Sequence, residues 1–486
     1  MTAPLGDRWR LTLAALLVAG CVASVCAVFP DSYLLLIAAL IAVPAFFVTA
    51  AWRPEAFLVG CVFMPQWKSV WPLDRFGGVA DLTVVMLLGL FVGVLWRSLR
   101  HVSRLERDNF SQLFRGQWLV LSSYILFCAV VLASYTYTSA PNYGGVKLVR
   151  FLMIGSLFLF SGIILIRNEN EFRRTSLLFV AAACITALQM IFHLQHRSLI
   201  AETDITRIGA GWLLGMSILL LLAYPIVRSP RYKLVFVFIA LPLLTAGLIA
   251  SAARGPFVSL VLTLPLTVLW FSKHRISAGW IGVSALLIAS CLGSYVYLRQ
   301  LDPGKYSSKL SEMVMLSQGD STSGSGGKRL TFYSQTLAAI PDHFWLGQGI
   351  GSWSVFYSGR DMRYYPHNLF LETTFEEGVL GQILLLLFLC LLAAGTHKML
   401  IATEFHYGVL AGLLAYCVSV SMFSGDLDDD RILWLWAGIT IAICRNAYLQ
   451  RRRLGLVRLY KRDEERPVHG TDSRQSVFAH SHALKG

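Results

Sequence analysis

Apolar residues along this chain occur in long consecutive blocks, not in the alternation of half-buried strands or the one-sided pattern of soluble helices. A helix that crosses the roughly 30 Å of a bilayer's hydrocarbon needs about 20 such residues. Blocks close to that length lie near residues 11–29, 32–51, 55–72, 79–96, 117–138, 147–166, 176–195, 210–227, 234–250, 256–271, 279–298, 379–396, 406–423 and 432–447. The pattern predicts an all-α polytopic membrane protein with roughly 12–14 transmembrane helices.

Three of these blocks predict spans less firmly than the others. Block 55–72 contains Pro65 and Lys68, which interrupt it. Blocks 234–250 and 256–271 form either one broken helix or two short ones. Block 11–29 follows Arg8 and Arg10 as in a signal peptide, but a second apolar block follows at once, so we expect an uncleaved first span.

Composition supports the same class, because 56% of the 486 residues are hydrophobic and only 14% are charged. All nine cysteines lie inside apolar blocks without a CxxC pair, which favours small core side chains over disulfides or a zinc site. The net charge of +14 does not predict nucleic-acid binding here, since the basic residues cluster between the apolar blocks.

Lysine and arginine concentrate in every second connection between the blocks, and such connections face the cytoplasm. They lie near residues 8–10, 97–115, 167–174, 228–233, 273–275, 398 and 451–453. Both termini are therefore expected in the cytoplasm. We divide the chain into an N-terminal bundle at 1–298, a large outer loop domain with a helical cap at 299–378, C-terminal spans at 379–449 and a basic, then disordered, cytoplasmic tail at 450–486.

Some basic residues in the outer connections are not explained by this topology, and they include Lys147, Arg150, Arg207, Arg254, Arg329, Arg360 and Arg363. A charge at the membrane edge is costly without a partner, so these residues are candidates for binding. The stretch SAARGPF at 251–257 breaks the helical pattern beside Arg254, which suits a phosphate, although a tight loop with a snorkelling arginine is the alternative. Arg207 lies just before a glycine-bearing span and allows the same two interpretations.

Arg329 begins a helix-like segment after the glycine-serine run 317–327, and it belongs either to a site or to a solvated helix face. The run itself is either a gate or a passive linker. The glycines of GQGIG at 347–351 resemble a dinucleotide-binding loop, but no strand precedes them. We therefore expect a turn there.

The stretch YYPHNLFLETTFEEGVLG, residues 364–381, places ionisable groups directly before an apolar block. Pro366 predicts a helix start that puts His367 and Asn368 on the first turn. Glu372 and Glu376 are four residues apart and share a helical face, while Gly378 marks a break before the next span. A histidine with carboxylates nearby can take a proton from a hydroxyl. The alternative is a polar collar that holds the span at the interface.

No second histidine or cysteine lies at ligand spacing from His367, so the sequence predicts no metal site. The acidic stretch SGDLDDDR at 424–431 either binds a cation or pairs with the outer arginines. We expect pairing of Asp426 and its neighbours, because those arginines already supply the positive charge.

The order of these features resembles the O-antigen ligase and polymerase superfamily of the bacterial envelope over roughly residues 205–440. The resemblance rests on a Ser-x-x-Arg-Gly break (Ser251, Arg254, Gly255), an arginine before a helix (Arg329), a Leu-Gly-x-Gly turn (Leu346, Gly347, Gly349), and His-Asn-x-x-Leu-Glu (His367, Asn368, Leu371, Glu372) running into Gly378. It implies a glycosyltransferase-C-like membrane fold that works without a metal or other cofactor.

The resemblance also implies a donor glycan linked to undecaprenyl diphosphate and an active site on the periplasmic face of the inner membrane. Arg207, Arg254 and Arg329 would bind the diphosphate and His367 would act on the acceptor hydroxyl. Supporting roles would fall to Asn368, Glu372, Ser251 and Asp426.

The acceptor is the lipid A core for a ligase, a second lipid-linked glycan for a polymerase, or protein serines for a third relative. The long outer segment before the last three spans favours the ligase. A transporter of an anionic lipid or solute is the alternative of another class, but it should show matching halves, and none is visible.

Overall fold

The computed structural model describes residues 45–46, 48–67, 82–102, 117–166, 168–195, 204–224, 226, 230–271, 278–301, 324–402 and 408–464. Every regular element in these ranges is a helix, which confirms the all-α prediction. Block 11–29, residues 317–323 of the glycine-serine run and the tail from 465 lie outside the described residues. Residues 1–445 form one compact unit and 446–486 a second.

The first helices follow the predicted blocks: α3 (Pro54–Trp67), α4 (Leu82–Val102), α6 (Trp118–Ser134) with the short turn η3 (Tyr135–Tyr137), α7 (Pro141–Val149), the π-helical turn η4 (Arg150–Gly155), α8 (Ser156–Leu165) and α9 (Glu169–Gln195). The described part of block 55–72 is the 14-residue helix α3, and residues 68–72 of the block lie outside the described residues.

The middle of the chain forms α10 (Asp204–Ala223), α11 (Pro230–Ala250), α12 (Arg254–Phe271) and α13 (Ala278–Leu301). Blocks 234–250 and 256–271 thus belong to two separate helices. The turn between them contains Ala252 in the left-handed region, with φ 52°, which a continuous helix does not allow.

The outer loop domain contains α15 (Gly324–Ala339), the 3₁₀ turn η5 (Ile340–His343), α16 (Trp353–Ser358) and α17 (Leu369–Glu376). The chain then continues as α18 (Gly378–Ala402), α19 (Gly408–Ser424) and α20 (Arg431–Glu464). Residues 450–464, the basic part of the tail, are helical because α20 continues through them. This stretch is rich in leucine, arginine and lysine, which favour helix.

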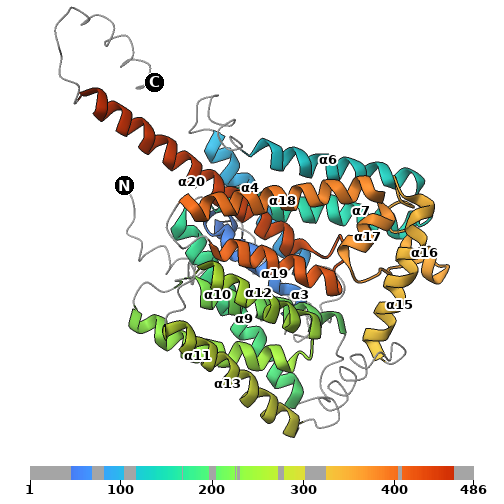
Figure 1. Cartoon of the computed structure of the whole chain (residues 1–486), viewed down its shortest axis with the longest axis horizontal. Coiled ribbons are helices and arrows are strands. Elements are labelled where there is room, and N and C mark those ends of the chain that lie inside the picture. The colour runs from blue at the N-terminus through green and yellow to red at the C-terminus, as the bar shows by residue number, and fades with distance from the viewer. Residues whose placement is uncertain are drawn as a thin grey trace, which may run out of the picture. The chain divides into compact units, whose positions relative to one another are not determined.

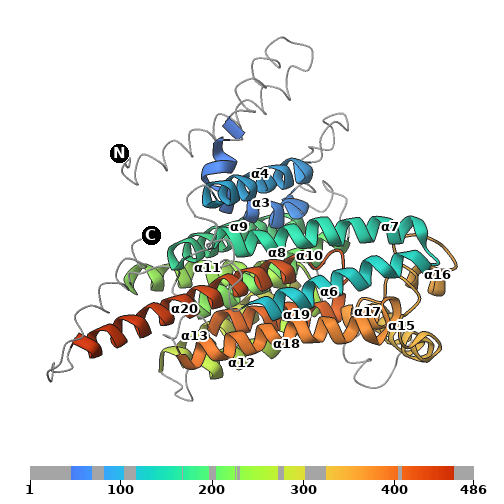
Figure 2. The ribbon, with the colours of Figure 1, turned by 90° about the horizontal axis from the view of Figure 1, so that it is seen from above.

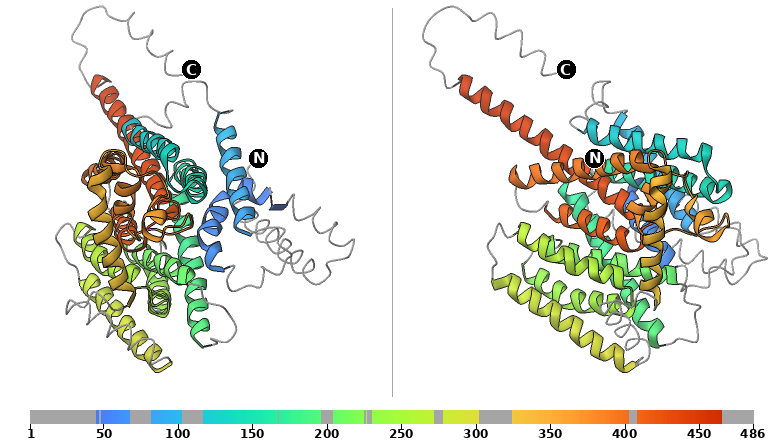
Figure 3. Two further views of the ribbon diagram at one scale, coloured as in Figure 1. Left: turned by 90° about the vertical axis from the view of Figure 1, so that its right-hand side faces the viewer. Right: turned by 45° about the vertical axis from the view of Figure 1, so that its right-hand side comes forward.

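Within the described residues, four helical segments are long and apolar enough to span a membrane: Trp118–Tyr137, Pro141–Leu165, Glu169–Phe192 and Gly378–His397. Helices α6, α7 and α18 run side by side, and α15, α16 and α17 gather at one end of them (Figures 1 and 2). Figure 3 shows α15 lying across the ends of the bundle helices. The outer loop domain is thus a helical cap on one end of the spans.

Contacts at the opposite end of the Pro141–Leu165 span agree with the predicted topology. The Arg97 guanidinium donates from Nη1 to the Leu165 carbonyl at 2.9 Å and pairs with Glu171 at 3.0 Å. The end of α4 and the junction of α8 with α9 therefore lie on the same side, as the charge pattern predicts for connections 97–115 and 167–174. The start of α7, 24 residues before Leu165 in the same span, contacts the cap instead.

Candidate functional site

The glycine-containing turn of the cap holds the junction of α17 and α18. Gly347 and Gly378 have positive φ values of 71° and 70°. The amides of Gln348 and Gly349 donate to Phe375 O at 2.9 Å and Glu376 O at 2.8 Å. A Cβ added to Gly347 would collide with Glu376 O, so these backbones approach too closely for any side chain. The expectation that GQGIG forms a turn is confirmed.

His367 lies just outside α17, and the predicted helix start at Pro366 is wrong. Asn368 is the N-cap, because its Oδ1 accepts hydrogen bonds from the amides of Phe370 at 3.0 Å and Leu371 at 3.1 Å. The cap residue must leave helical geometry, and His367 before it adopts φ 62°. A short polar side chain that caps the helix therefore sets the start, not the proline two residues earlier.

Aromatic side chains surround the His367 imidazole. It stacks on Phe332 of α15 with ring centroids 6.2 Å apart and meets Tyr365 edge-on at 4.5 Å. Burial lowers the pKa of His367 to about 4, and the charges of Arg329 and Arg363 act in the same direction. The imidazole is therefore neutral at pH 7, and its buried Nδ1 has no hydrogen-bond partner among the described residues.

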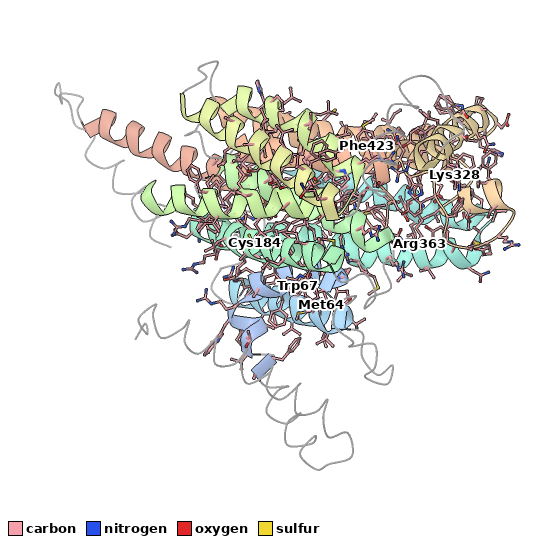
Figure 4. The ribbon with its side chains drawn as sticks, turned by 90° about the horizontal axis from the view of Figure 1, so that it is seen from below. Met64, Trp67, Cys184, Lys328, Arg363 and Phe423 are labelled. Carbon is pink, nitrogen blue, oxygen red and sulfur yellow. The ribbon has the colours of Figure 1, made fainter. Side chains whose placement is uncertain are left out.

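The last turn of α19 ties the cap to the bundle beside this histidine. Arg329 donates from Nη1 to Phe423 O at 2.6 Å. The Tyr333 hydroxyl lies 3.0 Å from Met422 O and 3.3 Å from His367 O. Both α15 side chains thus dock on main-chain carbonyls, and Tyr333 reaches the histidine backbone as well. Figure 4 labels Phe423, Arg363 and Lys328, the neighbour of Arg329, at this end of the bundle, with Cys184 of α9 farther along.

Arg254, in the first turn of α12, also lies beside the end of α19. A Cβ on the adjacent Gly255 would lie 3.0 Å from Phe423 Cβ, so α12 begins directly against the end of α19. Burial lowers the pKa of Arg329, and the charge of Arg254 acts in the same direction, which is the effect of two nearby cations. Arg254 and Arg329 therefore lie together near His367.

Arg207 and Ser251 lie around the turn that precedes α12. A Cβ on Gly211, one helical turn after Arg207 on α10, would lie 2.9 Å from Ala253 Cβ. Ser251 donates to Leu248 O at 2.6 Å and accepts from Ala253 N at 3.3 Å, so its hydroxyl shapes the turn. The sequence-predicted residues Arg207, Ser251, Arg254, Arg329 and His367 thus come from elements that meet around the end of α19.

Glu372 and Glu376 do not contact the imidazole, and neither faces the membrane interface, because both are fully buried. They bind the ammonium group of Lys147 on α7, with 2.6 Å between Nζ and Glu376 Oε2. Asp426 Oδ1 lies 3.7 Å from the same Nζ. Burial raises the pKa of Glu372 and of Asp426, and the charge of Lys147 opposes both shifts. Three carboxyl groups thus surround one ammonium group.

Two further acidic residues of 424–431, Asp428 and Asp429, pair with outer arginines, as expected. Asp428 lies 3.4 Å from Arg150, and Arg363 pairs with Asp429 and with Asp426 at 3.8 Å. The described residues contain no group of three or more histidine, cysteine or acidic side chains arranged to hold a metal ion.

Sequence reasoning named Lys147 as an outer cation that topology does not explain, but it did not predict the partners of that residue, Glu372, Glu376 and Asp426. Lys147 is a charged residue inside an apolar block on the outer side, but the glutamates that it binds are 225 and 229 residues away. No spacing rule connects positions so far apart.

Residues 239–386 match the family described as O-antigen ligase. The match confirms the resemblance to the O-antigen ligase and polymerase superfamily of glycosyltransferase-like membrane enzymes. It covers Ser251, Arg254, Arg329 and His367, whereas Lys147, Arg207 and Asp426 lie outside it. A comparison with curated proteins gives no match.

Proposed function

We propose that the protein is an O-antigen ligase that transfers a glycan from undecaprenyl diphosphate to the lipid A core oligosaccharide at the periplasmic face of the bacterial inner membrane. One observation carries the proposal: a neutral histidine and two arginines meet at the end of α19, and all three belong to the segment 239–386 that matches the O-antigen ligase family.

The arginines act on the leaving group. When the glycan leaves, negative charge develops on the diphosphate oxygen, and fixed cations stabilise that charge most in the transition state. Arg254, Arg329 and Arg207 supply the cations, and the first amides of α12 supply further donors. Because the guanidinium groups are held in advance, no metal ion is needed to neutralise the diphosphate.

His367 acts on the acceptor. Its neutral imidazole takes the proton of the acceptor hydroxyl while the hydroxyl oxygen attacks the anomeric carbon, and the bond from that carbon to the diphosphate oxygen breaks. In-line attack inverts the anomeric centre. The bound diphosphate offsets the positive charge of Arg329, which raises the pKa of His367 and makes it a stronger base in the complex.

Related reactions share this donor and differ in the acceptor. A polymerase would extend a second lipid-linked glycan, and a protein O-oligosaccharyltransferase would use serine hydroxyls. A transporter of an anionic lipid would use the same arginines to line a path, without chemistry at His367.

The test uses purified protein, undecaprenyl-diphosphate-linked glycan and lipid A core, with a chelator present. We expect glycan-bearing lipopolysaccharide on a gel from the parent, and a loss of at least about a hundredfold in His367→Ala, the range of a removed general base. His343→Ala is the matched control, since that histidine is exposed in η5 and outside the site.

Each contrary product indicates another function. Elongated lipid-linked glycan would indicate a polymerase, and transfer to protein would indicate the third relative. No transfer to any acceptor, together with movement of the lipid-linked glycan across vesicles, would overturn the proposal in favour of a transporter.

A further inference from the structure

The segment that carries His367 is held on its N-terminal side by the start of α7. The Asp361 carboxylate accepts hydrogen bonds from the amides of Asn142 and Tyr143, both at 2.8 Å. These amides belong to the first turn of α7, where backbone donors lack partners within the helix. Asp361 lies six residues before His367, so the loop leading to the histidine is fixed to the Pro141–Leu165 span.

On the C-terminal side, the same helix holds the segment through Lys147. The ammonium group is completely buried and binds Glu372 and Glu376. Both glutamates lie on one face of α17, whose cap Asn368 directly follows His367. A contact with two successive turns fixes the rotation of α17 about its axis as well as its position. The direction in which the chain leaves His367 is thereby set.

The loop between α19 and α20 contacts both α7 and the segment that carries His367. Asp426 lies 3.7 Å from Lys147 and 3.8 Å from Arg363, and it accepts a hydrogen bond from Tyr143 at 3.3 Å. Arg363 is four residues before His367. The loop follows Phe423, whose carbonyl holds Arg329, so one short stretch orients the arginine and the segment of the histidine together.

We propose that Lys147 is a positioning residue for His367, a proposal that rests on the function of His367 as the base. Replacing a buried ion pair with apolar groups is often neutral or stabilising, so stability alone does not account for a lysine among three carboxyl groups. The contacts instead fix one geometry, in which the imidazole packs against Phe332 and Tyr365. A π-helical turn begins at Arg150, three residues after Lys147, and such a turn contains one residue more than a turn of α-helix.

The test compares Lys147→Met with the triple variant Lys147→Met/Glu372→Gln/Glu376→Gln, in which the buried charges are removed together and Asp426 keeps Arg363. We expect kcat to fall roughly a hundredfold in both, the effect of a misplacement of about 1 Å, with the donor KM within about threefold of the parent. Lys328→Met, at an exposed lysine of α15, is the control.

A second measurement does not need activity. Diethyl pyrocarbonate modifies accessible neutral imidazoles, and mass spectrometry reports the rate at His367 in each variant. We expect faster modification in both Lys147 variants and an unchanged rate in Lys328→Met. If His367→Ala kept full transfer, the proposed function would fail, yet the modification rate would still test the positioning.

Two outcomes would overturn the inference. Parental kcat and modification rate in the folded triple variant would mean that Lys147 only neutralises buried carboxylates. Failure of the triple variant to fold, although its charges were removed together, would make Lys147 a folding residue instead.

Discussion

At the scale of single residues, the site depends on keeping one imidazole uncharged beside two guanidinium groups. Burial among Phe332 and Tyr365 disfavours the charged form of His367, and the nearby arginines disfavour it further. Because we propose that Arg329 binds the anionic donor, we expect the proposed base to have its lowest pKa when the site is empty.

The pH dependence follows from this shift. We expect kcat/KM to stay high as the pH falls and to decline only near pH 4, because kcat/KM reports the pKa of the base in the free enzyme. Initial rates between about pH 4 and pH 8 would measure the decline. In Arg329→Gln one of the two cations is gone, and the decline should move toward the ordinary histidine pKa. A parent profile that already declines near pH 6.5 would contradict the neutral, low-pKa base.

The lowered pKa of His367 also makes the free energy of unfolding depend on pH. The unfolded chain binds a proton at this histidine near pH 6.5, whereas the folded protein binds it only near pH 4. The contribution of His367 to the free energy of unfolding is therefore complete above about pH 6.5 and is lost as the pH falls to about 4.

Sequence reasoning identified many of the residues at this scale but not their neighbours. Arg254, Arg329 and His367 stood out as ionisable groups that topology does not explain. Phe332, which stacks on His367, and the Phe423 carbonyl, which accepts from Arg329, come from parts of the chain that are far away in sequence and were not predictable. The pairing of Glu372 with Lys147 was missed for the same reason.

At the scale of elements, the cap is attached through two glycines that face each other. A Cβ on Gly378 would collide with Trp345 O, and one on Gly347 with Glu376 O, and both residues need positive φ. Main-chain atoms cannot rotate away as side chains can, so an added methyl group must push α17 from the turn.

Gly378→Ala should therefore lower the free energy of unfolding by at least about 2 kcal/mol, from left-handed strain plus the clash. Gly359→Ala is the matched control, because Gly359 has φ 68° but no heavy atom within 4 Å of an added Cβ. It should lose only about 1 kcal/mol. Thermal unfolding in detergent compares the two variants, and equal losses would rule out the close approach of the two backbones.

Most helices were predictable because apolar blocks give them directly, while their ends depend on local chemistry. The start of α17 was misplaced because a capping asparagine outweighs a proline two residues earlier. The extent of α20 was underestimated because its polar half has helix-favouring residues but no apolar signal.

At the scale of the whole molecule, the predicted topology assigns the cap and the Arg97–Glu171 contact to opposite sides of the membrane. The Pro141–Leu165 span separates them. The charge pattern of the sequence predicts this arrangement, because a topology prediction needs only the order of the basic connections along the chain and not their contacts.

Single cysteines report the orientation directly. Ser334→Cys, on an exposed position of α15, should react with a membrane-impermeant maleimide in intact spheroplasts, and Glu169→Cys, exposed at the start of α9, should react only after lysis. The parent protein measures the background from its native cysteines. The reverse pattern would place the cap in the cytoplasm and remove the basis for a periplasmic reaction.

The docking of α15 on the carbonyls of Met422 and Phe423 also has a consequence for sequence evolution. Every residue type offers the same carbonyl, so position 422, whose side chain is 45% exposed, can mutate without breaking the hydrogen bond from Tyr333. Homologues can therefore differ in sequence at the end of α19 while α15 keeps its hydrogen bonds to the main chain there.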